Sequence, residues 1–225
     1  MIINKEAEMK QHLIIFTLLV LLTGNIFSYR NGFDPDGSII DQYVDTFPYE
    51  EISDFERTSL LHMREEEKLA RDVYNYLYER WGLRIFNNIS SAEQMHMDSV
   101  RTILQKYNIP DPVLSDDLGA FSDEGLRELY TTLINKGNNS LTDALLVGAT
   151  IEDLDIFDLQ DALLKSDNLD ILFIFGNLKK GSENHIRAFT NQLNRFNITY
   201  EAQYITQDEL EKILSSNSPG RGRNW

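Results

Sequence analysis

A single carboxylate interrupts the apolar face of the first long helix that the sequence predicts. Through residues 60–81, every third or fourth residue falls on one side of a helix, and that side is apolar except at Glu67. Its members are Leu60, Met63, Glu67, Ala70, Tyr74, Leu77 and Trp81. An unpaired charge on a buried face costs free energy, so Glu67 needs a polar partner inside the fold.

Helix boundaries follow from local capping signals. A serine followed three residues later by a glutamate, which is a capping box, predicts helix starts at Ser53 and Ser90. Ser140 caps a third long helix, and no strand pattern of any length is present. Long helices are therefore expected over 53–81, 90–107, 141–165 and 169–196, and shorter ones over 123–136 and 207–214.

The inner faces of the other long helices also carry carboxylates and imidazoles. Residues three apart lie one turn apart on the same face, so a pair at this spacing can reach one centre. Oxygen and nitrogen ligands without sulfur suit iron or manganese, and less often zinc. The candidate metal ligands are Glu67, Glu93, His96, Glu152, Asp155 and His185.

Each candidate ligand also has a simpler interpretation. Glu66 or Glu67 could form a salt bridge with Arg64 or Arg71 on a solvated face, and Glu93 could serve only as the capping residue of its helix. The histidines could be hydrogen-bonded core residues. The coincidence of the same ligand chemistry on four helices favours a metal site. On the last long helix, Gly176 and Gly181 either weaken the helix or let another backbone approach.

Composition excludes several classes of function. Lys and Arg number 21 against 36 Asp and Glu, and the net charge of −15 argues against a nucleic-acid partner. The chain has no cysteine, which excludes disulfides, thiolate metal sites and cysteine nucleophiles.

The N-terminus has the pattern of an export signal. Lys5 and Lys10 precede an apolar run over 13–22, which is short for a membrane span and typical of a signal peptide. We expect a periplasmic or extracellular protein, with an uncleaved membrane anchor as the alternative. The expected organisation is a signal or anchor over 1–28, an acidic linker over 29–52, a helical domain over 53–214 and a disordered tail over 215–225.

Four stretches together resemble a known family. Residues 63–74, 88–97, 148–156 and 181–189 are similar to a family catalogued as a domain of unknown function, among the rubrerythrin-like proteins of the ferritin superfamily. The resemblance implies an all-α, ferritin-like four-helix bundle, with one long crossover that carries a short extra helix and with a short C-terminal helix.

The same resemblance implies roles for the candidate ligands. Glu67 would be the ligand from the first helix, Glu93 a bridging carboxylate and His96 a terminal ligand. The remaining ligands would be the third-helix carboxylates Glu152 and Asp155 and the last histidine, His185. The chain departs from the superfamily pattern at Ser182, where a glutamate is expected, and this leaves open a di-metal centre, an asymmetric pair or a single metal.

The function implied is that of a di-iron or di-manganese oxidoreductase, such as a ferroxidase or a peroxide-scavenging protein. Its expected partners are metal ions and small oxidants, and a homodimer remains open. The alternative is a non-catalytic helical binding protein that retains the bundle with a degenerate metal site, which Ser182 favours.

Overall fold

The computed structural model describes residues 43–216, which contain six helices and no strand. The prediction of an all-α chain is therefore confirmed for this range. The expected signal over 1–28, the linker up to residue 42 and the tail from residue 217 lie outside the described residues. The helices are α3 (Asp54–Trp81), α4 (Arg84–Lys106), α5 (Glu124–Gly137), α6 (Leu141–Lys165), α7 (Leu169–Asn194) and α8 (Gln207–Ser215).

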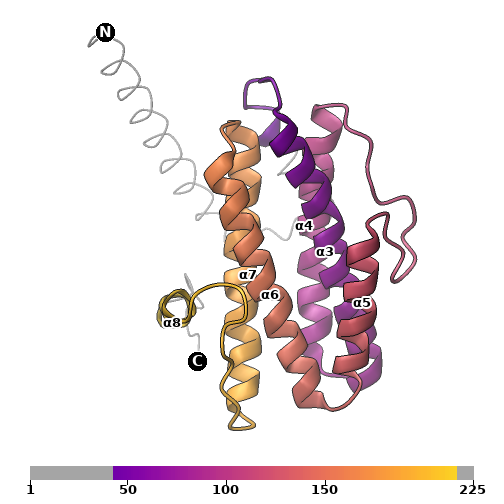
Figure 1. Ribbon diagram of the computed structural model, residues 1–225, viewed down its shortest axis with the longest axis vertical. Coiled ribbons are helices and arrows are strands. Elements are labelled where there is room, and N and C mark those ends of the chain that lie inside the picture. Colours follow the sequence, from indigo (N-terminus) through magenta and orange to yellow (C-terminus); the bar gives the residue numbers. More distant parts are fainter. Residues whose placement is uncertain (1–42, 217–225) are drawn as a thin grey trace, which may run out of the picture. The chain divides into compact units, whose positions relative to one another are not determined.

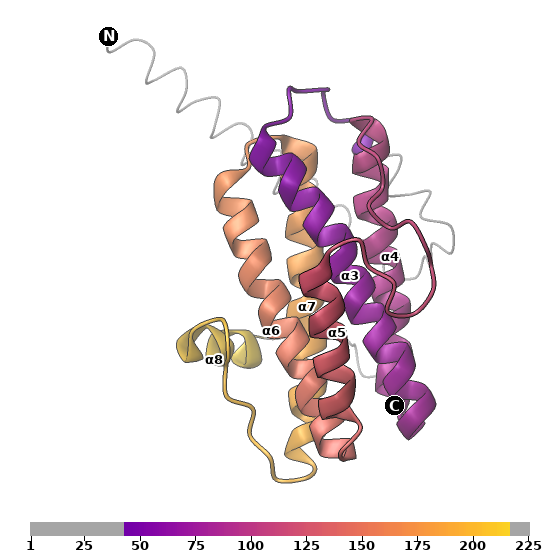
Figure 2. The ribbon, with the colours of Figure 1, turned by 45° about the vertical axis from the view of Figure 1, so that its right-hand side comes forward.

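Four long helices lie side by side and form a bundle of two hairpins. Figure 1 shows α3 beside α4 and α6 beside α7, and the turned view in Figure 2 shows the shorter α5 against α3 and α6. The turn between α3 and α4 is tight because Gly82 adopts a left-handed φ of 66°, which glycine tolerates without strain. No helix in residues 43–216 combines the length and the apolar character needed to cross a membrane.

The expected start of the second long helix at Ser90 is wrong. Helix α4 begins at Arg84, and the Ser90 hydroxyl donates a hydrogen bond to the Asn87 carbonyl, 3.0 Å away, inside the helix. Phe86 and Ile89 are buried, so tertiary packing extends the helix beyond the local capping signal. Glu93 therefore has no capping role, and its position needs another explanation.

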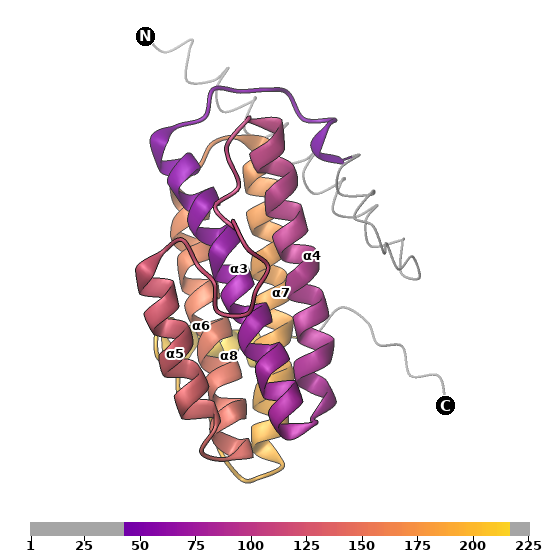
Figure 3. The same ribbon diagram turned by 90° about the vertical axis from the view of Figure 1, so that its right-hand side faces the viewer.

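The middle of α3 is buried on every side. Figure 3 shows the connection between α4 and α5 passing over α3. Lys68 pairs with Asp72 at 2.5 Å and donates to the backbone carbonyl of Asp117 in this connection. Every residue of 64–72 is buried, so the alternative interpretation of a solvated face at Glu66 and Glu67 is wrong.

Arg64 and Arg71 do not pair with Glu66 or Glu67, although the simpler interpretation of the sequence required it. Arg64 makes a two-pronged contact with Asp111, and Arg71 contacts Asp72, Asp116 and Gln94. Salt bridges to these two arginines therefore do not explain Glu66 and Glu67.

Residues 43–52 pack against one end of the bundle. Val44 is buried, and the Lys106 ammonium donates to the backbone carbonyls of Val44 and Phe47 at 3.1 Å. Phe47 also lies 5.4 Å from the ring of Phe173 in α7. This end of the bundle is therefore closed by apolar and hydrogen-bonded contacts.

Candidate metal centre

Glu93 lies between two histidines in the middle of the bundle. One carboxylate oxygen, Oε2, is 2.7 Å from Nδ1 of His96 on the same helix. The other oxygen, Oε1, is 2.9 Å from Nδ1 of His185 on α7. Glu93 is only 2% exposed, so this carboxylate faces two different imidazoles inside the protein.

Two further carboxylates complete two groups of three. Glu67 on α3 brings Oε2 to 3.1 Å from Nδ1 of His96, and Glu152 on α6 brings Oε2 to 3.3 Å from Nδ1 of His185. In each group one candidate ligand atom from each residue lies within 4.8 Å of the others. The groups are Glu67, Glu93 and His96, and Glu93, Glu152 and His185, so that Glu93 belongs to both.

Asp155 lies beside these groups but belongs to neither. It lines a small cavity together with Glu67, Glu93 and Glu152. The Ser182 hydroxyl donates a hydrogen bond to Oδ2 of Asp155, while Oδ1 is buried without a hydrogen-bond partner. Where the resemblance expects a glutamate, the structure thus has a serine that holds a carboxylate of the neighbouring helix.

Tyr74 fixes the position of Glu152. Its hydroxyl donates to Oε1 of Glu152 at 2.5 Å, and the tyrosine side chain is fully buried. The Tyr74 ring packs 5.3 Å from Phe189, and the lack of a side chain at Gly148 makes room for Phe189. Apolar rings therefore close the centre on this side. The hydrogen bond from Tyr74 engages Oε1 of Glu152, and Oε2 is the oxygen that faces His185.

The lack of a side chain at Gly181 leaves room for the imidazole of His96. A Cβ atom built on Gly181 would lie 2.5 Å from Cε1 and Nε2 of His96, closer than real contacts allow. The imidazole therefore occupies the space that a side chain would fill. Of the two alternatives given for Gly181, the approach of another backbone is wrong, because the neighbour is the side chain of His96. No sequence pattern indicates that Gly181 and His96 are in contact, because the two residues are far apart in the chain.

Burial and mutual repulsion govern the protonation of the carboxylates. Burial raises the pKa of Glu67 to about 7, although nearby His96 opposes the shift. Burial and the charge of Glu93 raise the pKa of Glu152 to about 7. Asp155, buried and close to Glu67, also has a pKa well above its ordinary range.

The pKa shifts of Glu93 and of the two histidines instead favour the charged forms of these groups. Burial alone would raise the pKa of Glu93, but His185 and His96 outweigh it and lower the pKa below the usual range of a carboxyl. Burial would lower the pKa of His185, but Glu93 and Glu152 raise it to about 10. Protons on the imidazoles thus compensate the buried negative charge in this structure.

Several polar atoms at the centre have no hydrogen-bond partner. These atoms are Oε1 of Glu67, Oε1 of Glu93, Oδ1 of Asp155 and Nδ1 of His185. The Glu93 and His185 atoms are close enough for an ion pair but are not aligned for a hydrogen bond. Buried polar atoms nearly always have partners, so their concentration at one place fits the binding of metal ions.

Comparison with known proteins places these residues in a family. The family model described as "Uncharacterized protein domain (DUF2202)" matches residues 56–217. An uncharacterized protein of Methanocaldococcus jannaschii, MJ0754, is 54% identical over 183 residues, which cover 81% of this chain and 98% of that protein. The crystal structure of the hypothetical protein MJ0754 matches with a TM-score of 0.76 and covers 76% of this chain and 98% of that one.

Proposed function

This chain belongs to the DUF2202 family, and on that premise we propose that it is a ferritin-like metal protein whose buried centre holds two ions of iron or manganese. Ferritin-like carboxylate proteins take their ligands from all four helices of a bundle, with a glutamate from each of two helices and a Glu-x-x-His pair from each of the other two. The two hairpins and the pair Glu93 and His96 support this assignment. Zinc suits the ligand set less well.

The two groups of three that share Glu93 carry the proposal. One ion would be held by Glu67, Glu93 and His96. The other would be held by Glu93, Glu152 and His185. Because each oxygen of Glu93 faces a different histidine, this carboxylate would contribute a ligand to both ions.

Such a pair of ions supplies redox chemistry toward Fe(II), dioxygen or peroxide when it is bound. The protein contributes the positions of the ligands. Tyr74 orients Glu152 through a hydrogen bond, and Ser182 orients Asp155. In the metal-free protein the pKa of Glu67 and that of Glu152 are each about 7, so protons that these carboxylates hold near neutral pH would be released when metal binds.

The absence of cysteine favours a self-contained reaction. The chain has no thiolate for an iron–sulfur or rubredoxin-type electron relay. A ferroxidase or a peroxide-scavenging activity needs no such relay, because the substrates themselves supply the electrons.

Metal analysis after anaerobic reconstitution with Fe(II) or Mn(II) tests the centre. We expect Glu93→Ala to lower the metal content by about two ions per chain, because Glu93 belongs to both groups. Glu211→Ala, which removes an exposed carboxylate of α8, is the control and should leave the content unchanged. Less than one ion per wild-type chain, or no loss in Glu93→Ala, would reject the proposal.

Ser182 favours a second candidate, a bundle that binds metal without turnover. It stands where the ferritin-like pattern has a carboxylate ligand. Adding Fe(II) with dioxygen, or peroxide, to the loaded protein separates the two functions. Consumption of either oxidant supports the oxidoreductase, and a loaded protein that consumes neither supports the non-catalytic alternative.

A further inference from the structure

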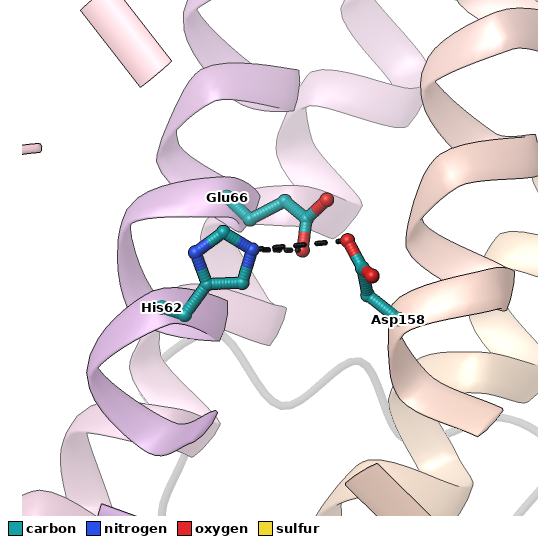
Figure 4. A group of neighbouring side chains, drawn as sticks. All are labelled: His62, Glu66 and Asp158. Carbon is teal, nitrogen blue, oxygen red and sulfur yellow. Dashed lines mark ion pairs between the residues drawn. The ribbon is translucent and has the colours of Figure 1, made fainter. Parts of the chain in front are cut away.

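A third group of potential ligands lies outside the centre just described. His62 and Glu66 are one turn apart on α3, and Asp158 projects toward them from α6 (Figure 4). Nε2 of His62 is 3.5 Å from Oε2 of Glu66 and 3.7 Å from Oδ2 of Asp158. None of the three belongs to the two groups that share Glu93.

Glu66 is the unusual member of this group. It is only 2% exposed, and neither of its carboxylate oxygens has a hydrogen-bond partner. Figure 4 shows its carboxylate turned toward the His62 ring and Asp158. Leaving a buried carboxylate without hydrogen bonds costs free energy, and a second carboxylate beside it adds repulsion. These costs indicate that the group is built to receive a positive charge.

The distances from the His62 nitrogen to the two carboxylates fit a bound cation better than they fit hydrogen bonds. An N–H···O hydrogen bond spans about 2.7–3.2 Å, so both contacts of His62 are too long to be hydrogen bonds. Nitrogen and oxygen ligands at about 2.1 Å from a tetrahedral metal ion lie roughly 3.4 Å apart. The observed separations need only small side-chain movements to reach that value.

The surroundings let an ion reach the group from solvent. The His62 side chain is 40% exposed and that of Asp158 is 29% exposed, whereas Glu66 is buried behind them. Glu66 also lines the small cavity that contains Glu67 and Asp155. The group thus has an open outer side and a closed inner side next to the centre.

We propose that His62, Glu66 and Asp158 form a separate site for one divalent first-row metal ion, at the solvent side of the bundle centre. One imidazole and two carboxylates are ligands that suit Fe(II), Mn(II) and Zn(II), with water filling the remaining positions. The ligands are distinct from those of the buried centre, so the site does not depend on the function proposed above.

Zn(II) is a suitable probe because it has no redox chemistry and scatters anomalously. Crystals of the full chain soaked in Zn(II) should show an anomalous peak between His62 and Asp158. Equilibrium dialysis at micromolar free Zn(II) should show one ion per chain fewer for His62→Ala and for Glu66→Gln. Asp161→Ala removes an exposed carboxylate of α6 that pairs with Lys165, and as the control it should change neither result.

Glu93→Gln separates this site from the centre. It should abolish the peaks at the centre and leave the outer peak in place. No wild-type peak at His62, or unchanged Zn(II) binding by both His62→Ala and Glu66→Gln, would overturn the site. An outer peak without any peak at Glu93 would support this site by itself, and reconstitution with Fe(II) or Mn(II) then decides the buried centre.

Discussion

Two adjacent residues of α3 have different surroundings. Glu67 faces His96 and the centre of the bundle, whereas Glu66 faces His62 and Asp158. Successive residues of an α-helix point about 100° apart, so neighbours along the chain can reach different sites. The run of three glutamates therefore does not have one role, and Glu65 has a third, since it accepts hydrogen bonds from the backbone N–H groups of residues 122 and 123.

Gly181 is predicted to be needed for metal binding. In Gly181→Ala the new methyl group would displace the His96 imidazole and lower the affinity of the centre for Mn(II) at least tenfold. Gly176→Ala, on the same helix, has nothing within 4 Å of the new atom and should keep the wild-type affinity. It should also stabilise the helix by about 0.5–1 kcal/mol. Isothermal titration calorimetry with Mn(II) measures both affinities, and equal values would show that His96 has room to move.

The sequence predicted the buried candidate ligands better than the partly exposed residues His62 and Asp158. Helical spacing suffices to select Glu67 and His185, because an apolar face with one polar interruption is a distinct pattern. It cannot select His62 or Asp158, because both are partly exposed and a polar residue at such a position is ordinary. Whether the six candidate ligands bind metal stays a prediction.

At the scale of elements, buried ion pairs hold the connection between α4 and α5 on α3. Lys68 and Asp72 are both fully buried, and the backbone N–H of Gly119 donates to Asp72 at 3.0 Å. Sequence periodicity marks these residues as a polar face, but it cannot show that a distant loop covers that face. The helix ends were easier to predict where capping is local, as at Ser53 and Ser140.

Removing one partner of this pair should destabilise the fold strongly. Asp72→Ala leaves the Lys68 ammonium buried without its carboxylate, which costs about 3–5 kcal/mol. The exposed pair of Lys165 and Asp161 has the same spacing on α6, and Asp161→Ala should cost less than about 1 kcal/mol. Urea unfolding of both variants gives the two free energies. Equal losses would mean that Asp72 contributes no more than a surface charge.

For the whole molecule, the centre makes stability depend on pH and on metal. Without metal, the folded pKa of Glu152 is about 7 against an ordinary value of 4.5, and that of His185 is about 10 against 6.5. The folded state therefore binds more protons than the unfolded state between these values, and stability falls as pH rises. Metal ions replace these protons, so metal affinity should rise over the same range.

We expect the metal-free protein to lose stability between pH 5 and pH 9. Glu152→Gln removes one titrating group and keeps an acceptor for the Tyr74 hydroxyl, so the loss between pH 4.5 and about 7 should shrink by the order of 1–3 kcal/mol. Thermal melting in the presence of a chelator measures this effect. A wild-type melting temperature that stays constant or rises across the range would contradict it.

The shared position of Glu93 has a consequence for the order of folding. Helices α3 and α4 form one hairpin, and α6 and α7 form the other, each from segments close in the chain. Local hairpins form quickly, whereas docking the two hairpins requires distant segments to meet. Glu93 reaches His96 within its own hairpin and His185 in the other, so the complete set of groups exists only after docking. We expect docking of the two hairpins to be the rate-limiting step of folding. Metal at Glu93 would bind only after docking, so it would slow unfolding more than it speeds refolding.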